Sequence, residues 1–111
     1  KESSDLILKR IDEINNDNLP VILTGDFNLE DNNPIIKNIQ KYLTDVQFNI
    51  DKSNKYYGTF TGFKHSKIIE KRIDYIFVKN IKVNQSKHVH LKTPINGWAS
   101  DHHPVLTTLK F

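Results

Sequence analysis

The chain has 111 residues, of which 37% are hydrophobic and 26% charged, and its formal net charge is +3. This length allows one domain with a modest core, and no apolar run approaches the roughly 20 residues of a membrane-spanning helix. The absence of cysteine excludes disulfides and thiolate zinc sites and leaves the redox compartment open. The small positive charge mildly favours an anionic partner. Because the chain begins at Lys1, without a methionine or a signal-like segment, we expect a cut piece or a mature product.

The first half of the sequence predicts two helices separated by a buried strand. Residues 4–16 predict an amphipathic helix, whose apolar residues are Ile7, Leu8, Ile11 and Ile14. Pro20 ends any helix before it, and the continuously apolar, β-branched run at 21–24 predicts a strand buried on both faces. Asn33-Pro34 is a typical helix start. The apolar stripe expected to follow it consists of Ile35, Ile39, Tyr42 and Leu43.

The second half predicts short strands separated by polar loops. Residues 57–63, which hold aromatics, threonines and two glycines, predict a short strand with tight ends, and residues 64–71 predict an exposed basic loop. Residues 72–78 are strongly strand-like, and residues 83–91 less so. Residues 104–111 alternate, and the residues on one side are Val105, Thr107, Leu109 and Phe111. This mixture of helices and strands predicts an α/β fold built in layers.

The block Gly25-Asp26-Phe27-Asn28 directly follows the predicted buried strand. A loop that leaves such a strand holds its side chains in place and leaves them accessible. An ionised Asp26 can bind a divalent cation or hold a nucleophilic water, and the Asn28 amide can donate to a phosphate oxygen. The same residue types also form ordinary turns. Taken alone, this block leaves an active-site loop and a simple turn equally open.

The block Arg72-Ile73-Asp74-Tyr75-Ile76 places an acid inside an apolar strand. Burying a carboxylate is costly unless it is paired, hydrogen-bonded or bound to a metal. Arg72 lies two residues from Asp74, on the same face of a strand, so a local ion pair is one interpretation. The favoured interpretation is that Asp74 orients a histidine and stabilises its imidazolium.

A suitable histidine lies in the block Ser100-Asp101-His102-His103-Pro104. Asp101 is a candidate ligand for a hard, oxygen-seeking cation, and His102 is a candidate general base or phosphate contact. A polar loop ended by Pro104 is the simpler alternative for a lone Asp-His pair. Three such blocks in one small chain favour a shared explanation, which is a metal-dependent phosphate site.

Two further groups of residues have less specific patterns. His88 and His90 are spaced for one face of a strand and suit zinc, but with no third ligand a solvated strand face is the favoured interpretation. A basic cluster is interpreted either as a solvent-exposed loop or as a contact to a phosphate of nucleic acid or lipid. Its members are Lys64, His65, Lys67, Lys71 and Arg72.

In this order and spacing, the sequences GDFN, RIDYIFV and SDHHPV resemble the C-terminal half of the endonuclease/exonuclease/phosphatase superfamily. Its members include abasic-site endonucleases, deoxyribonuclease I, neutral sphingomyelinases, deadenylases and inositol polyphosphate phosphatases. The ordered triple is far more specific than any one block. The resemblance implies a DNase I-like fold, in which two mixed β-sheets flanked by helices form a four-layer α/β sandwich, with a magnesium site at one end of the sheets.

The resemblance also implies a role for each matching residue. Asp26 would position or activate the attacking water, Asn28 would stabilise the pentavalent transition state, and Asp74 would orient His102. His102 would contact the scissile phosphate or act in proton transfer, and Asp101 would serve the metal site. The implied metal ligands are Asp101, Asp26 and Asn28, for Mg²⁺ with Mn²⁺ as the alternative ion. Candidate substrate-binding residues are His65, Lys67, Arg72 and Trp98.

Members of this superfamily are considerably longer than this chain, and their N-terminal half supplies an Asn, a metal-binding Glu and a His-bearing strand. Residues 1–111 are therefore expected to be a partial domain without its N-terminal half, and to be inactive or nearly so alone. The sheet face that normally packs on the other sheet would be exposed, which is a folding liability. The missing half has either been lost or is supplied by another chain.

The favoured function is therefore the C-terminal portion of a Mg²⁺-dependent phosphoesterase that hydrolyses phosphodiesters, or phosphomonoesters, by in-line attack of water. One alternative is a non-catalytic module that keeps the fold and binds a partner. Another is a small basic nucleic-acid-binding domain, against which the modest net charge argues. The fold does not choose among nucleic acid, phospholipid and inositol phosphate as substrates. The basic loop and the loop of Asn96 and Trp98 are candidates for specificity, and the localisation stays open.

Overall fold

The structure is a computed structural model that describes residues 2–47, 57–63, 69–90, 92–93 and 97–111. The chain begins with helix α1 (Glu2–Ile14), strand β1 (Val21–Asp26), helix α2 (Pro34–Gln40) and the short strand β2 (Thr44–Asp45). Strands β3 (Asp74–Lys79), β4 (Lys82–His88) and β5 (Val105–Lys110) follow. This order of elements confirms the predicted α/β class.

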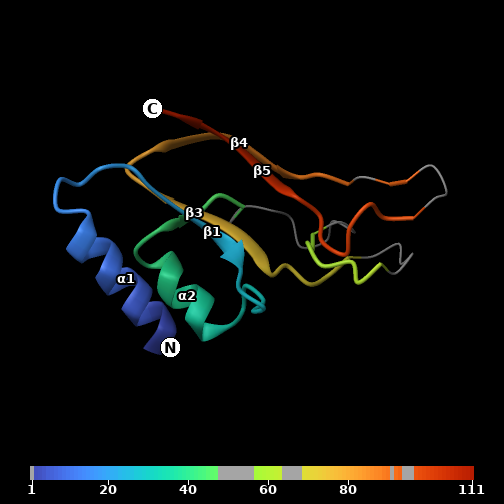
Figure 1. Cartoon of the computed structure of the whole chain (residues 1–111), viewed down its shortest axis with the longest axis horizontal. Helices are drawn as coiled ribbons and strands as arrows, with labels where there is room; N and C mark the ends of the chain where they lie inside the picture. Colours follow the sequence, from blue (N-terminus) through green and yellow to red (C-terminus); the bar gives the residue numbers. More distant parts are fainter. Residues whose placement is uncertain (1, 48–56, 64–68, 91, 94–96) are drawn as a thin grey trace.

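The strands form two antiparallel sheets. One has the order β1-β3-β2, and the other consists of β4 and β5. Figure 1 shows both helices side by side on one side of the first sheet, and the β4–β5 pair on the other side of β3. Along β1 and β3 the register runs from Val21 opposite Lys79 to Asp26 opposite Asp74. The end of β1 and the start of β3 therefore meet at one end of the sheet.

The hydrophobic core lies between the helices and the three-stranded sheet. Tyr75 and Phe77 alternate on the face of β3 that the helices cover, as the two-residue period of a strand requires. They pack against Ile36 and Ile39 of α2 and against Leu43, all of which are buried. The partly buried residues that complete this core are Leu8, Ile11, Leu23, Phe27 and Leu29.

The predicted start of α2 is confirmed, and its predicted apolar stripe is wrong in part. Asn33 caps the helix by accepting a hydrogen bond from the Ile35 N–H at 2.9 Å, and a proline takes the first turn. The buried residues of the helix are Ile36 and Ile39. Tyr42 is 62% exposed because α2 ends at Gln40, so helical spacing no longer decides where that side chain lies.

The predicted strand at 21–24 exists, but it is not buried on both faces. Its residues alternate between half-buried and exposed, and Ile22 is 49% exposed. The reason is that the helices cover one face of the sheet, where Leu23 packs against the core, and Ile22 lies on the other face. Position 14 of the predicted helix is likewise exposed rather than packed.

Three of the four strands predicted in the second half are confirmed as β3, β4 and β5, with shifted ends, although position 91 lies outside the described residues. The strand predicted at 57–63 is wrong: this segment is a loop with a single bridge between Phe60 and His102. Phe111 lies beyond the end of β5 and is 90% exposed, so its predicted place in the alternating face is also wrong. Among the described residues, no helix combines the length and the apolar character needed to span a membrane.

Candidate active site

Asp26 and Asp74 are direct partners in the β1–β3 ladder. Asp26 ends β1, and Asp74 begins β3. Residues directly opposite one another in an antiparallel pair lie on the same face, and two like charges placed in this way destabilise the sheet. The fold therefore creates a site at this end of the sheet that favours a cation or a proton donor.

His102 supplies that donor from the segment before β5. Its Nδ1 atom lies 2.7 Å from Asp74 Oδ2, and its Nε2 atom lies 3.8 Å from Asp26 Oδ2. The edge of its ring also contacts Phe60, with 5.2 Å between the ring centroids. The interpretation that pairs Asp74 with a histidine agrees with this contact, and the local Arg72–Asp74 ion pair does not form.

The charge state of His102 follows from these contacts. The hydrogen bond to Asp74 raises the pKa of His102 above its ordinary value, and burial opposes this effect only in part. The negative charges of Asp74, Asp101 and Asp26 raise the pKa further. The site therefore favours a protonated imidazole that can donate from both ring nitrogens.

Asn28 lies in the turn that follows β1. Its backbone has φ of 53°, a left-handed conformation that asparagine adopts more readily than most residues. Its N–H donates to Asp26 Oδ1 at 2.9 Å, which closes a tight turn around the carboxylate. Asn28 and His102 line the same cavity of about 350 Å³, together with Phe60 and Lys71. The first and third sequence blocks therefore meet at one cavity.

The described residues contain one group of acids and histidines that has the spacing of a metal site. It consists of Asp26, Asp74 and His102, whose ligand atoms lie within 4.8 Å of one another. Of the two predicted carboxylate ligands, Asp26 belongs to this group and Asp101 does not. The predicted role of the Asn28 amide as a ligand stays a prediction. The two carboxylates of the group suit a hard cation such as Mg²⁺, which is usually held by one or two carboxylates together with waters and substrate phosphates. His102 is not suited to be a ligand, because it bonds to Asp74 and favours its protonated form.

Arg72 does not lie where a substrate contact requires it. Its side chain is 2% exposed and pairs with Asp45 at 2.6 Å and Asp31 at 3.5 Å. The prediction that Arg72 binds substrate is therefore corrected: it is a buried structural cation. The sequence pattern misled because Arg72 precedes β3, so its side chain does not follow the alternation of that strand. Two other predicted substrate contacts, His65 and Lys67, lie outside the described residues, as does Asn96.

Trp98, the remaining predicted substrate contact, is 7% exposed. Its ring meets the edge of His103 with 4.6 Å between centroids, and Lys92 Nζ lies 5.0 Å from its ring centroid. Packing thus occupies most of this ring, which is at odds with a large stacking contact to substrate. His103 also meets His90, and burial lowers the pKa of His103 to about 4.

The expected solvated strand face at His88 and His90 is wrong for the first of these residues. His88 is buried, and β4 ends there, so the two imidazoles do not share one face of a strand. His90 is exposed and contacts the ring of His103.

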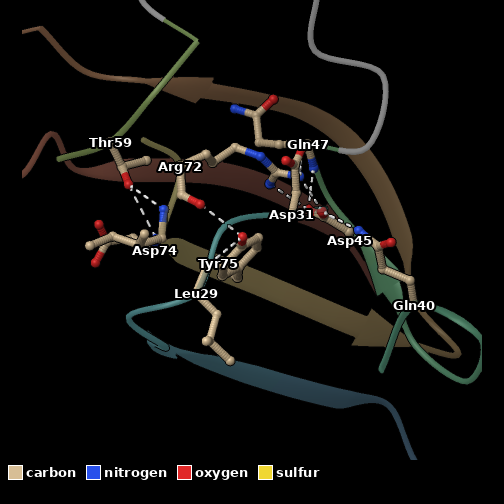
Figure 2. A network of polar contacts seen from close by, with 10 residues as sticks. Leu29, Asp31, Gln40, Asp45, Gln47, Thr59, Arg72, Asp74 and Tyr75 are labelled. Carbon is tan, nitrogen blue, oxygen red and sulfur yellow. Dashed lines mark hydrogen bonds and ion pairs between the residues drawn. The ribbon is translucent and has the colours of Figure 1, made fainter. Parts of the chain in front are cut away.

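Sequence reasoning missed the polar network that supports the site, which Figure 2 shows. The Tyr75 hydroxyl lies 2.8 Å from both the Leu29 and the Arg72 carbonyl oxygens, and so links the loop after β1 to the start of β3. The Thr59 hydroxyl accepts hydrogen bonds from the N–H groups of Ile73 and Asp74. A polar tip on a strand aromatic is a weak signal for Tyr75. Gly58-Thr59-Phe60 resembles the loop that precedes the second block in many family members, but this resemblance indicated no contact for Thr59.

Comparison with known proteins adds independent evidence. No curated protein matches the chain. A mannosyl-6-phosphatase of Bacteroides thetaiotaomicron VPI-5482 is 28% identical with a TM-score of 0.77, and the match covers 99% of this chain and 45% of that one. An endonuclease/exonuclease/phosphatase family protein from the same species is 27% identical with a TM-score of 0.78, covering 97% and 43%. A functionally unknown conserved protein from Enterococcus faecalis V583 is 26% identical with a TM-score of 0.74, covering 96% and 42%.

The chain thus spans less than half the length of each of these structures. The model of the Endonuclease/Exonuclease/phosphatase family matches residues 2–102, which is nearly the whole chain and includes all three blocks up to His102. The chain therefore belongs to the endonuclease/exonuclease/phosphatase family.

Proposed function

We propose that this chain is the C-terminal portion of a Mg²⁺-dependent phosphoesterase. The observation that carries the proposal is the position of His102 between Asp74 and Asp26, beside a cavity that Asn28 also lines. The family includes phosphatases and nucleases and generally uses divalent metals. A structural neighbour named as a mannosyl-6-phosphatase adds support for a phosphate ester as substrate.

In the proposed reaction, each residue acts on a different part of the phosphate ester. Asp26 holds the attacking water and accepts its proton, while the Asn28 side-chain amide donates to a phosphate oxygen as charge develops there. His102 donates from Nε2 to a second phosphate oxygen, and Asp74 keeps its ring oriented through Nδ1. The water oxygen bonds to phosphorus as the ester P–O bond breaks, and the leaving oxygen takes a proton from solvent.

A Mg²⁺ ion bound at Asp26 would neutralise charge on the phosphate oxygens. Asp26 is suited to this role because its side chain is 39% exposed, whereas Asp74 is already engaged with His102. Asp101 contributes negative charge that raises the pKa of His102. We therefore rank Asp26 above Asp101 as a ligand, for Mg²⁺ with Mn²⁺ as the alternative ion.

We also propose that the 111 residues are a partial domain and are inactive or nearly so alone. The neighbours are more than twice as long, and an apolar groove of about 630 Å³ runs between α1 and β1. The occupant we propose for this groove is the N-terminal half of the domain, which would complete a four-layer sandwich of two sheets and flanking helices. Its apolar lining residues are Leu6, Ile7, Ile11, Ile14, Leu19, Pro20, Val21 and Ile22.

The test is hydrolysis by the complete domain, either in a longer parent protein or with the N-terminal half added as a separate chain. The substrates are plasmid DNA, RNA, sphingomyelin, an inositol phosphate and a hexose 6-phosphate, each with Mg²⁺ and with EDTA. We expect one substrate class to be hydrolysed, and the activity to be lost with EDTA and in His102→Ala. The exposed His90→Ala is the matched control and should retain activity.

Three results would count against this proposal. Hydrolysis that survives both EDTA and His102→Ala would contradict the metal-dependent mechanism. Ordinary turnover by the 111 residues alone would contradict the partial domain. Failure to hydrolyse any substrate with Mg²⁺ or Mn²⁺ would favour the non-catalytic binding module. The basic nucleic-acid-binding alternative has lost support, because Arg72 of its basic cluster is buried and paired.

A further inference from the structure

Thr59 is a fully buried residue outside the three sequence blocks, and it bonds to the backbone of Asp74 and to that of His103, the residue after His102. Its Oγ1 atom accepts hydrogen bonds from the N–H of Ile73 at 3.0 Å and of Asp74 at 3.1 Å. Its carbonyl oxygen accepts the N–H of His103 at 2.6 Å. One residue therefore holds the chain on either side of the contact, as Figure 2 shows for the Asp74 side.

The segment around Thr59 is itself firmly attached. The N–H groups of Thr59 and Phe60 both donate to the Lys71 carbonyl, at 2.8 and 3.0 Å. Phe60 also forms the isolated bridge to His102, and its ring makes a T-shaped contact with the imidazole. The loop that replaces the strand predicted at 57–63 thus forms a brace between the start of β3 and the segment before β5.

A hydroxyl is well suited to this position because it has two acceptor lone pairs and can receive both N–H groups. The β2 strand pairs with β3 only near residues 77 and 78, so it does not reach Ile73 or Asp74. A buried N–H that loses its acceptor is costly, and the backbone shifts to find another partner. At this place such a shift moves Asp74 relative to His102.

We infer that Thr59 is a positioning residue that holds Asp74 and His102 at bonding distance through its side-chain hydroxyl and its carbonyl oxygen. Its effect on catalysis rests on the proposed function. Its effect on the Asp74–His102 contact does not, because that contact exists without substrate. Thr59 itself touches neither substrate nor metal in this proposal and acts through the two side chains it places.

The first test is Thr59→Val in the complete domain, since valine keeps the shape and removes the hydroxyl. We expect kcat to fall by about ten- to a hundredfold, as for other residues that orient a catalytic group, with a much smaller change in KM. Thr59→Ser should recover most of kcat because it restores the acceptor. Thr107→Val is the control: it removes a hydroxyl that bonds Ser86 and Gln85 in the β4–β5 pair and does not line the site cavity, and it should leave kcat unchanged.

The second test separates positioning from a general loss of stability. In an Asp74→Ala background, Thr59→Val should reduce kcat by less than about twofold, because the side chain that it positions is already removed. The proton on His102 Nδ1 should give a downfield NMR resonance in the native protein and in Thr59→Ser. In Thr59→Val this resonance should shift upfield or broaden.

Additive effects of the two substitutions, or an unchanged Nδ1 proton resonance in Thr59→Val, would overturn the inference. If Thr59→Val does not fold, Thr59→Ala replaces it. If neither folds while Thr59→Ser does, the hydroxyl is required for the fold itself, and a specific positioning role is rejected. If the native protein hydrolyses none of the tested esters, the proposed function fails, but the resonance still decides the role of Thr59.

Discussion

His102 and Asp74 are 28 residues apart in the sequence, and their side chains form a 2.7 Å hydrogen bond. A carboxylate accepts hydrogen bonds and does not donate them, so Nδ1 of the imidazole carries a proton. This contact turns Nε2 toward Asp26. One bond thus determines which ring nitrogen faces the site and biases the ring toward its charged form.

Asp74→Asn should reduce kcat of the complete domain by about two to four orders of magnitude, because the ring loses its charge partner and the tautomer that the carboxylate fixes. The pKa of His102 should fall toward its ordinary value, since the hydrogen bond to Asp74 is the largest cause of its increase. An NMR titration of His102 measures this change. A His102 pKa that is the same in both proteins would contradict the assigned cause.

The same contact predicts how stability depends on pH. Because the pKa of His102 is raised in the folded state, its contribution is complete below the ordinary value of about 6.5 and is lost as pH rises through the raised value. The stability difference between native protein and Asp74→Asn should thus be larger at about pH 5.5 than at about pH 9. Urea unfolding at the two pH values tests the sign.

His103 should have the opposite effect. Burial lowers its pKa to about 4, so the stability it contributes as a neutral ring is complete above about pH 6.5 and is lost as pH falls toward 4. His103→Phe keeps an aromatic ring beside Trp98 and His90 and removes the titration. Its unfolding free energy should fall less than that of the native protein between about pH 7.5 and 5. Equal losses would show that His103 is not the group responsible.

Arg72→Met should destabilise the complete domain by about 3–5 kcal/mol, because it leaves Asp45 charged and buried without its partner. Replacing both residues, as Arg72→Met with Asp45→Leu, should recover part of this loss. Arg10→Met is the matched control, since Arg10 pairs with Glu13 on an exposed helix surface and should change stability by less than about 1 kcal/mol. Similar losses in both arginine variants would contradict a special role for the buried pair.

Tyr75→Phe removes the hydroxyl that lies between the Leu29 and Arg72 carbonyls. We expect a loss of about 1–3 kcal/mol in unfolding free energy, since buried carbonyls lose a donor. We also expect a lower kcat, because Asn28 directly precedes Leu29 in the loop that the hydroxyl holds. Tyr42→Phe is the control: that ring is 62% exposed and should tolerate the change in both measurements.

The elements best predicted from the sequence are those whose local pattern agrees with their surroundings. β3 and β5 are runs of β-branched and aromatic residues, and Asn33-Pro34 begins α2 through local capping chemistry. Ile22 was expected to be buried but is half exposed. A run of apolar residues indicates that a strand favours burial, whereas its actual burial depends on elements that are distant in the sequence. In the part of the chain that the structure describes, nothing covers that face of β1.

For the site, the residue types in the three blocks indicated the chemistry, but partners had to come from tertiary structure. A carboxylate in an apolar strand requires a partner, and the partner of Asp74 is His102. Arg72 was the candidate partner nearer in sequence. Arg72 instead pairs with Asp45, which lies in a two-residue strand too short to show any periodicity. The segment of Thr59 resembled a family loop, but its contacts could not be predicted, because its hydroxyl bonds to backbone groups that every sequence shares.

The left-handed backbone at Asn28 restricts how that residue can be examined by mutagenesis. Replacing Asn28 with alanine removes the amide and also strains the turn, so its effect mixes chemistry with geometry. Asn28→Gly keeps the conformation and removes only the side chain. The difference between the two variants measures the cost of the turn, and the loss that glycine alone produces belongs to the amide. A single backbone angle thus makes glycine, and not alanine, the informative deletion at this position.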